Sequence, residues 1–73
     1  MTLGEFLLTP EGRRLNRAGW AREFEIASGY LSQLANGIKV PSLPTALLIE
    51  DRTRGKVTPY DWGVKVPQKN ETV

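Results

Sequence analysis

The stretch that decides the fold is Trp20–Gly37, which reads WAREFEIASGYLSQLANG. Apolar residues recur in it at helical spacing, with an interruption at Glu25–Ala27, so the pattern predicts two short helices joined by a tight link. The small residue Ala21 lets two helix backbones cross closely. Gly37 is expected to end the second helix, because glycine readily adopts the left-handed conformation found at helix C-termini. The apolar anchors on the two sides of the link are Trp20, Phe24, Ile26, Leu31 and Leu34.

The second of these helices, expected at residues 28–35, has an unusual outer face. Its residues are short, polar and uncharged, whereas the exposed side of a helix normally carries long charged residues. Short side chains let a helix backbone approach a ligand, and their donors and acceptors suit base edges in a DNA major groove. Gln33 is the strongest candidate, because its amide can form two hydrogen bonds to adenine. An ordinary solvated face is the alternative. The predicted base-reading residues are Ser28, Gly29, Ser32 and Gln33.

Before this stretch the sequence predicts further helical segments. Thr2 and Glu5 have capping-box spacing and begin a helix with an apolar face at Leu3, Phe6 and Leu7. Thr9-Pro10 interrupts the pattern, and Pro10 can also be the first residue of a new helix. A helix is then expected from Arg13 to Phe24. Its core side is predicted to hold Leu15, Trp20, Ala21 and Phe24.

After this stretch a further helix is expected from Leu43 to about Arg54, capped by Ser42 and ended by Gly55. Its inward residues are predicted to be Leu43, Ala46, Leu47 and Ile49. Thr58-Pro59-Tyr60-Asp61 repeats the signature of a helix start, and Trp62 is expected to fold back over the core. Residues 63–73 are predicted to form a tail with a short strand at Val64–Val66, followed by disorder.

The composition narrows the classes of function. The chain has 73 residues, enough for one small domain, and it has no cysteine and no histidine. This excludes disulfides, Cys/His zinc sites and Ser-His catalysis. There is no carboxylate cluster, no nucleophile beside a base and no phosphate-binding glycine loop, so we expect no enzyme activity, cofactor, metal or small-molecule substrate. The short apolar runs and the absence of a signal-peptide pattern predict a cytoplasmic location without membrane contact.

Positive charge is concentrated in the middle of the chain. Residues 12–40 hold five cations and two acids, whereas the first eleven residues hold two acids and no cation. This distribution can attract a polyanion, although a solvated surface explains it equally well. On DNA, such residues would contact phosphates and fix the register without reading sequence. Tyr30 fits the edge of the core equally well. The predicted DNA-backbone residues are Arg17, Arg22, Tyr30, Asn36 and Lys39.

Trp20–Gly37 resembles the helix-turn-helix of the phage repressor, Cro and XRE-type regulators. Pro41–Glu50 looks like the fourth helix of that family, and Gly55–Asp61 is similar to the ending of its small Cro-like and YdaS-like prophage members. The resemblance implies an all-α, compact four-to-five-helix lambda-repressor-like domain over residues 1–62, followed by a flexible C-terminal tail. It also implies a Cro-type repressor that binds a palindromic double-stranded DNA operator as a homodimer in a bacterial host.

Two residues depart from the family pattern. Glu25 stands where the family usually has a glycine with positive φ, a conformation that costs other residues on the order of 1–2 kcal/mol. Ala27 stands where a serine or threonine cap is usual, and Ser28 is expected to take over the cap. These departures concern the local stability of the turn and leave the expected fold unchanged.

The remaining expectations concern protein partners. Aromatic and β-branched residues near the C-terminus exceed what a four-helix core needs, which favours a dimer interface at Tyr60, Trp62, Val64 and Val66. The rival hypothesis is a protein-interaction module of the same fold, such as part of a toxin–antitoxin pair or an anti-regulator, whose tail at Gly63–Val73 orders on a partner. The polar face at residues 28–36 favours DNA, since protein interfaces are enriched in aromatic residues.

Overall fold

The chain begins with the predicted capping box. In the computed structural model, which describes residues 1–63, α1 spans Leu3–Leu7. The Thr2 backbone N–H donates to the Glu5 carboxylate at 2.8 Å, and the Glu5 N–H donates to the Thr2 hydroxyl oxygen at 3.2 Å. Each bond satisfies an N–H group that the helix itself cannot pair. The helix buries Leu3 and Phe6 against the rest of the domain.

Thr9 turns the chain after α1. Its hydroxyl donates to the Phe6 carbonyl at 2.6 Å and accepts from the Gly12 N–H at 3.0 Å. The turn leads into a short 3-10 helix, η1 (Gly12–Arg14). A Cβ atom at Gly12 would stand 2.0 Å from the Phe6 carbonyl oxygen. Glycine is therefore required here, where two stretches of backbone touch.

The predicted helix from Arg13 to Phe24 is wrong in its first part. η1 ends at Arg14, Leu15 is extended, and α2 spans only Arg17–Glu23. The N-cap of α2 is Asn16, whose side-chain oxygen accepts from the Gly19 N–H at 2.7 Å. An asparagine side chain that binds a nearby backbone N–H favours a helix start over a helix interior. Leu15 consequently leaves the core, and 39% of its surface is exposed.

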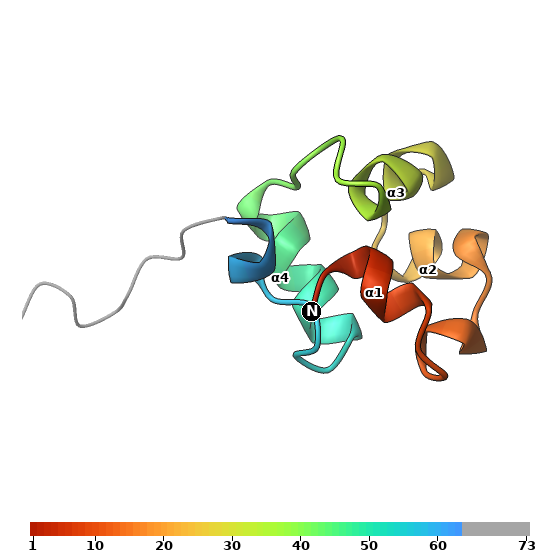
Figure 1. Ribbon diagram of the computed structural model, residues 1–73. Coiled ribbons are helices and arrows are strands. Elements are labelled where there is room, and N and C mark those ends of the chain that lie inside the picture. The colour runs from red at the N-terminus through yellow and green to blue at the C-terminus, as the bar shows by residue number, and fades with distance from the viewer. Residues whose placement is uncertain (64–73) are drawn as a thin grey trace, which may run out of the picture.

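Two longer helices and a second 3-10 helix complete the described chain. α3 spans Ser28–Ala35, with the predicted bounds, and α4 spans Leu43–Arg52. η2 follows at Pro59–Trp62. α3 packs on α1 and α2, whereas α4 packs on η2 (Figure 1). Residues 1–63 thus form a compact all-α domain of four α-helices, and none of these helices is long and apolar enough to cross a membrane.

Three helices end in a left-handed residue one position beyond the cap. Glu25 ends α2 with φ 58°, and the Ile26 N–H donates to the Ala21 carbonyl at 2.9 Å. Gly37 ends α3 with φ 76°, and Arg54 ends α4 with φ 57°. The bonds to the last carbonyls of each helix make these Schellman motifs. The predicted left-handed glycine at Gly37 and the positive φ at Glu25 are both confirmed.

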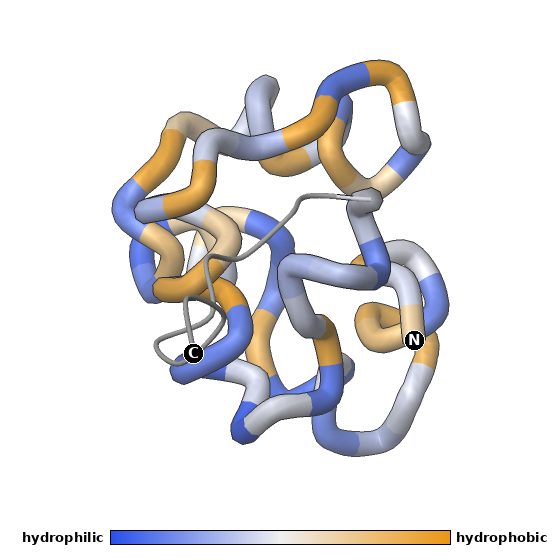
Figure 2. Tube along the Cα trace, turned by 90° about the vertical axis from the view of Figure 1, so that its left-hand side faces the viewer, coloured by the Kyte–Doolittle hydropathy of each residue, from blue (hydrophilic) through white to orange (hydrophobic). Residues whose placement is uncertain are grey.

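Three aromatic rings form the centre of the core. Trp20 packs edge-on against Phe6 with 5.2 Å between ring centroids, and it stacks on Phe24 at 5.5 Å. The Trp20 indole N–H donates to the Gly12 carbonyl at 2.6 Å, which satisfies two buried polar groups. Hydrophobic and hydrophilic residues alternate along the trace, as expected of helices with one apolar face (Figure 2). The other residues of the buried cluster are Leu3, Ala21, Leu31, Leu34, Ile49 and Val57.

The inward face of α4 differs from the prediction. Ala46 and Ile49 are buried as expected, but 43% of the surface of Leu47 is exposed. The buried stripe continues to Thr53, seven residues beyond Ala46, because that spacing keeps to one side of the helix. The Thr53 hydroxyl donates to the Ile49 carbonyl at 2.8 Å and accepts from the Val57 N–H at 3.1 Å. A pattern of apolar residues alone does not predict this threonine.

η2 joins the two ends of the described chain. The Asp61 carboxylate accepts from the Thr58 backbone N–H at 2.7 Å and from the Thr58 hydroxyl at 3.1 Å. It lies 3.3 Å from the Met1 amino group, which also donates to the Lys56 carbonyl at 3.0 Å. The hydrogen bond from the Thr58 backbone is the main cause that lowers the pKa of Asp61. Trp62 is half-buried and packs against the core, as predicted.

Candidate nucleic-acid interface

α3 presents the polar face expected from the sequence. Leu31 and Leu34 are buried on one side of the helix, and no residue of α3 is charged. Of the predicted base-reading residues, Ser32 is half-buried and the others are exposed, namely Ser28, Gly29 and Gln33. The helix therefore offers hydroxyl, amide and backbone groups to a ligand, and none of its own side chains is charged.

The cap of α3 differs from the prediction, although the helix begins at Ser28 as expected. The N-cap is Ala27, not Ser28, and α3 has no side-chain cap hydrogen bond. The Leu31 N–H donates to the Ala27 carbonyl at 3.0 Å, which starts the first turn one residue earlier than a cap at Ser28 would. Ser28 is thus the first residue inside the helix, and it does not serve as the cap. The first turn of α3 is left without the side-chain oxygen that usually binds its N–H groups.

Gly29 is not required by packing within the chain. A Cβ atom built on it meets no heavy atom within 4 Å. Glycine inside a helix costs about 1 kcal/mol relative to alanine, so this position reduces the stability of α3 without relieving a clash. The missing side chain leaves the backbone of α3 open on its outer face, where a ligand can approach closely.

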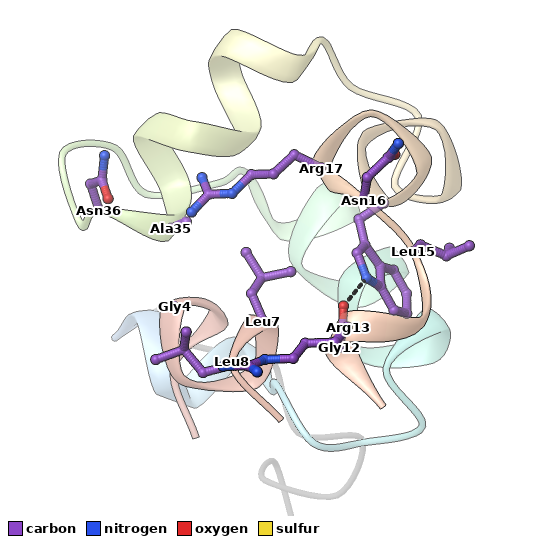
Figure 3. Close-up of a pocket in the computed structure, with 11 residues that line it drawn as sticks. Gly4, Leu7, Leu8, Gly12, Arg13, Leu15, Asn16, Arg17, Ala35 and Asn36 are labelled. Atoms are coloured by element: carbon purple, nitrogen blue, oxygen red, sulfur yellow. Dashed lines mark hydrogen bonds between the residues drawn. The ribbon is translucent and has the colours of Figure 1, made fainter. Parts of the chain in front are cut away.

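α2 contributes one side chain to this face. The guanidinium of Arg17, in the first turn of α2, donates from Nη1 to the Ser32 hydroxyl oxygen at 3.3 Å. In Figure 3 the Arg17 side chain runs along α3 toward Ala35. The sequence predicts both residues for DNA binding in different roles. It does not predict that they touch, because they are 15 residues apart and meet only through the packing of α2 on α3.

The other predicted backbone-contact residues lie around α3. Arg22 is exposed in the last turn of α2, and Asn36 is exposed at the C-cap of α3. Lys39 is exposed in the loop between α3 and α4. Tyr30 is half-buried and packs against the core cluster, so it occupies the core-edge position.

The cations of the described chain fall into two groups. Arg52 pairs with Glu23 at 3.8 Å and also with Asp51, and Lys56 pairs with Glu11 at 3.9 Å. The cations of residues 1–63 without an ion pair are Arg13, Arg14, Arg17, Arg22, Lys39 and Arg54. Apart from Arg54, this second group belongs to η1, α2 and the loop after α3. Cations without a carboxylate partner are available to neutralise phosphates.

A groove of about 570 Å³ lies between α1, η1, the start of α2 and the end of α3. Leu7 lies in it between Arg17 and Arg13, as Figure 3 shows. Two other leucines of the groove are exposed, Leu8 by 68% and Leu15 by 39%. No acidic residue lines it. The sequence pattern does not predict this groove, because it places Leu15 in the core.

The predicted dimer residues are only partly within the described chain. Tyr60 has 61% of its surface exposed, whereas Trp62 packs on the core. The Trp62 indole nitrogen is buried and has no hydrogen-bond partner within residues 1–63. Val64 and Val66, and the tail after Gly63, lie outside the described residues.

The chain was compared with protein families, curated proteins and solved structures, and none of the three comparisons found a match. Within residues 1–63, no three carboxylates lie close enough together to hold a metal ion.

Proposed function

We propose that this chain is a sequence-specific DNA-binding transcriptional regulator, a Cro-type repressor in which α2 and α3 form a lambda-repressor-like helix-turn-helix. The observation that carries the proposal is the exposed and uncharged polar face of α3, with the open backbone at Gly29. α3 is the recognition helix in the major groove. Gln33 pairs with adenine, while Ser28 and Ser32 contact neighbouring base edges.

The turn between α2 and α3 supports this assignment. Glu25 has positive φ at the position where the phage repressor family usually has glycine. Ala21 is buried, and its carbonyl accepts the hydrogen bond from Ile26 that closes the turn. A helix pair fixed in this way can dock its second helix in the groove while the first lies across the backbone.

The exposed groups around α3 are the proposed phosphate contacts. Arg22, Asn36 and Lys39 are exposed near the two ends of α3, and neither cation has an ion pair within residues 1–63. These contacts contribute affinity that falls with salt and carries no sequence information.

A domain of this size covers one half-site, so we propose that it binds a palindromic operator as a homodimer. Recognition helices about 34–36 Å apart would reach successive major grooves on one side of the duplex. The exposed ring of Tyr60, together with the neighbouring Trp62, marks the proposed dimer surface.

The test is fluorescence anisotropy with duplexes from the DNA around the gene for this chain and a scrambled competitor, at two salt concentrations. We expect a preferred duplex that binds two protomers, with affinity falling steeply as salt rises. Gln33→Ala should lower the preference over the scrambled duplex. Equal and weak binding to all duplexes would reject the proposal.

The groove beside Arg17 supports a second candidate function, a protein-interaction module. Its exposed leucines and its arginines without any acid complement an acidic amphipathic segment of a partner protein. Leu8→Asp should then abolish binding of such a partner. It should leave DNA binding unchanged, because Leu8 lies outside the α3 face.

A further inference from the structure

We propose that Arg17 and Ser32 act as one base-reading pair, in which Arg17 recognises a guanine. This inference rests on the proposed DNA-binding function, and it changes the role of Arg17 from a phosphate contact to a specificity determinant. The observation behind it is the bond from Arg17 Nη1 to Ser32 Oγ at 3.3 Å. Among the arginines of residues 1–63, Arg17 alone forms a hydrogen bond with a side chain of α3.

The contact leaves most of the guanidinium available. Arginine has five N–H donors in a planar fork, and one Nη1 hydrogen is directed to Ser32. No carboxylate within residues 1–63 pairs with Arg17, so its remaining donors are not occupied by an ion pair. A guanidinium fork matches the O6 and N7 acceptors of guanine, which is the commonest specific contact in the major groove.

Ser32 gives this arginine a defined position. It lies next to Gln33 on α3, a helix without charged residues of its own. The hydroxyl of Ser32 holds the long side chain of Arg17 against the helix before DNA is present. Such preorganisation reduces the side-chain ordering that binding would otherwise require. Arg17 thereby adds a guanine reader to a helix whose own residues favour adenine through Gln33.

Lysine can replace an arginine that contacts a phosphate, but it cannot replace an arginine that forms two hydrogen bonds to a base. Lysine keeps the positive charge but lacks the planar fork, so Arg17→Lys preserves attraction to phosphate and removes two-bond recognition of guanine. Arg13→Lys is the matched control, because Arg13 has no hydrogen bond or ion pair with α3 within the described chain. Arg17 and Arg13 are both exposed, and circular dichroism would verify that each variant is folded.

The experiment begins by selecting the preferred site of the wild-type chain from a random duplex pool. Affinities of the wild type, Arg17→Lys, Arg17→Ala, Ser32→Ala and Arg13→Lys are then measured, at two salt concentrations, for that site and for each single base-pair substitution in it. We expect the wild type to prefer guanine at one position by roughly 5- to 150-fold, and Arg17→Lys to lose that preference alone. Ser32→Ala should weaken the same preference, and Arg13→Lys should leave it intact.

Two results would overturn the inference, and they are distinguishable. If Arg17→Lys keeps every base preference while Arg17→Ala weakens all duplexes alike and reduces the salt slope by about one, Arg17 contacts phosphate. In that case the proposed function survives. If the pool yields no preferred site for the wild type, the proposed function fails, and the inference fails with it.

Discussion

The indole nitrogen of Trp20 donates to the carbonyl oxygen of Gly12 at 2.6 Å inside the core. This bond joins α2 to η1 at a glycine whose hydrogen lies against the backbone of Phe6. The same indole packs against Phe6 and Phe24, so one side chain connects the first three helical segments. Trp62, the second tryptophan, has a buried indole nitrogen without a partner in residues 1–63.

Substitution by phenylalanine should destabilise the domain more at Trp20 than at Trp62. Trp20→Phe leaves the buried Gly12 carbonyl without its donor, which costs about 1–3 kcal/mol in addition to the lost packing. Trp62→Phe removes a donor that has no partner in the described chain, so its cost should be smaller. Urea unfolding followed by circular dichroism measures both free energies. A cost for Trp62→Phe as large as that for Trp20→Phe would contradict the structure.

Glu25→Gly should stabilise the domain. Glu25 has φ 58°, a conformation that costs a non-glycine residue on the order of 1–2 kcal/mol. Part of the gain is offset because glycine makes the unfolded chain more flexible, by about 0.4–1 kcal/mol. The expected net gain is therefore between about 0 and 1.6 kcal/mol. Arg54→Gly, at φ 57°, should change the thermal midpoint in the same direction. Destabilisation by both changes would show that the positive φ is not strained.

Gly29→Ala should raise the stability of the domain and lower its affinity for DNA. The new methyl group meets no atom within 4 Å, so the domain should gain up to about 1 kcal/mol from the better helix former. If DNA approaches α3 closely, the same methyl group should lower the affinity for the preferred duplex. At Gly19 a Cβ atom would lie 3.1 Å from the Leu15 Cβ, so Gly19→Ala should gain less stability. Unchanged affinity in Gly29→Ala would argue against close approach at this position.

Lys39→Ala should reduce the salt dependence of DNA binding. Lys39 is exposed beside α3 and has no ion pair within residues 1–63. If it contacts a phosphate, its loss should weaken all duplexes alike and reduce the slope of log affinity against log salt by about 0.9. Lys56→Ala removes the same charge from a lysine paired with Glu11 and should leave the slope unchanged. Equal slopes for the wild type and Lys39→Ala would exclude a phosphate contact there.

The domain should lose stability in acid partly through Asp61. The pKa of Asp61 is lowered in the folded state, chiefly by the Thr58 backbone N–H, so the unfolded chain takes up the proton first as the pH falls. The stabilisation is complete above the ordinary carboxyl pKa of about 3.9 and is lost as the pH falls through the lower folded value.

This loss of stability in acid can be checked from the thermal midpoints of the wild type and Asp61→Asn, measured from about pH 5 to about pH 2.5. Asp61→Asn should be the less stable protein at the higher pH, and the difference should shrink in acid. Asp51→Asn, at an exposed carboxylate on α4, is the control. A difference between Asp61→Asn and the wild type that stays constant over this range would show that Asp61 does not titrate with folding.

The parts of the fold that local chemistry determines could be predicted from the sequence. The capping box at Thr2 and Glu5, the bounds of α3 and the left-handed turn at Gly37 each depend on residues within a few positions of one another. The polar face of α3 could be predicted for the same reason, since the nearby residues Leu31 and Leu34 define the buried side of the helix.

The sequence-based predictions are wrong or incomplete where two local signals compete, or where a contact between distant residues determines the structure. At Asn16 the helix-start signal overrode the apolar period that placed Leu15 in the core. In α4 the polar residue Thr53 completes the buried stripe, whereas Leu47, which the apolar pattern placed inward, is exposed. The Arg17–Ser32 contact depends on how α2 packs against α3, and no spacing in the sequence specifies it.

The bridge from Met1 to Asp61 spans 60 positions of the chain. During synthesis on a ribosome, the N-terminal residues must therefore wait until nearly the whole domain has emerged before they meet these partners. The residues of α1, α2 and α3, which pack on one another, emerge well before Asp61 does. Growth of the chain thus makes the residues of α3 available first and leaves the contact between Met1 and Asp61 until last.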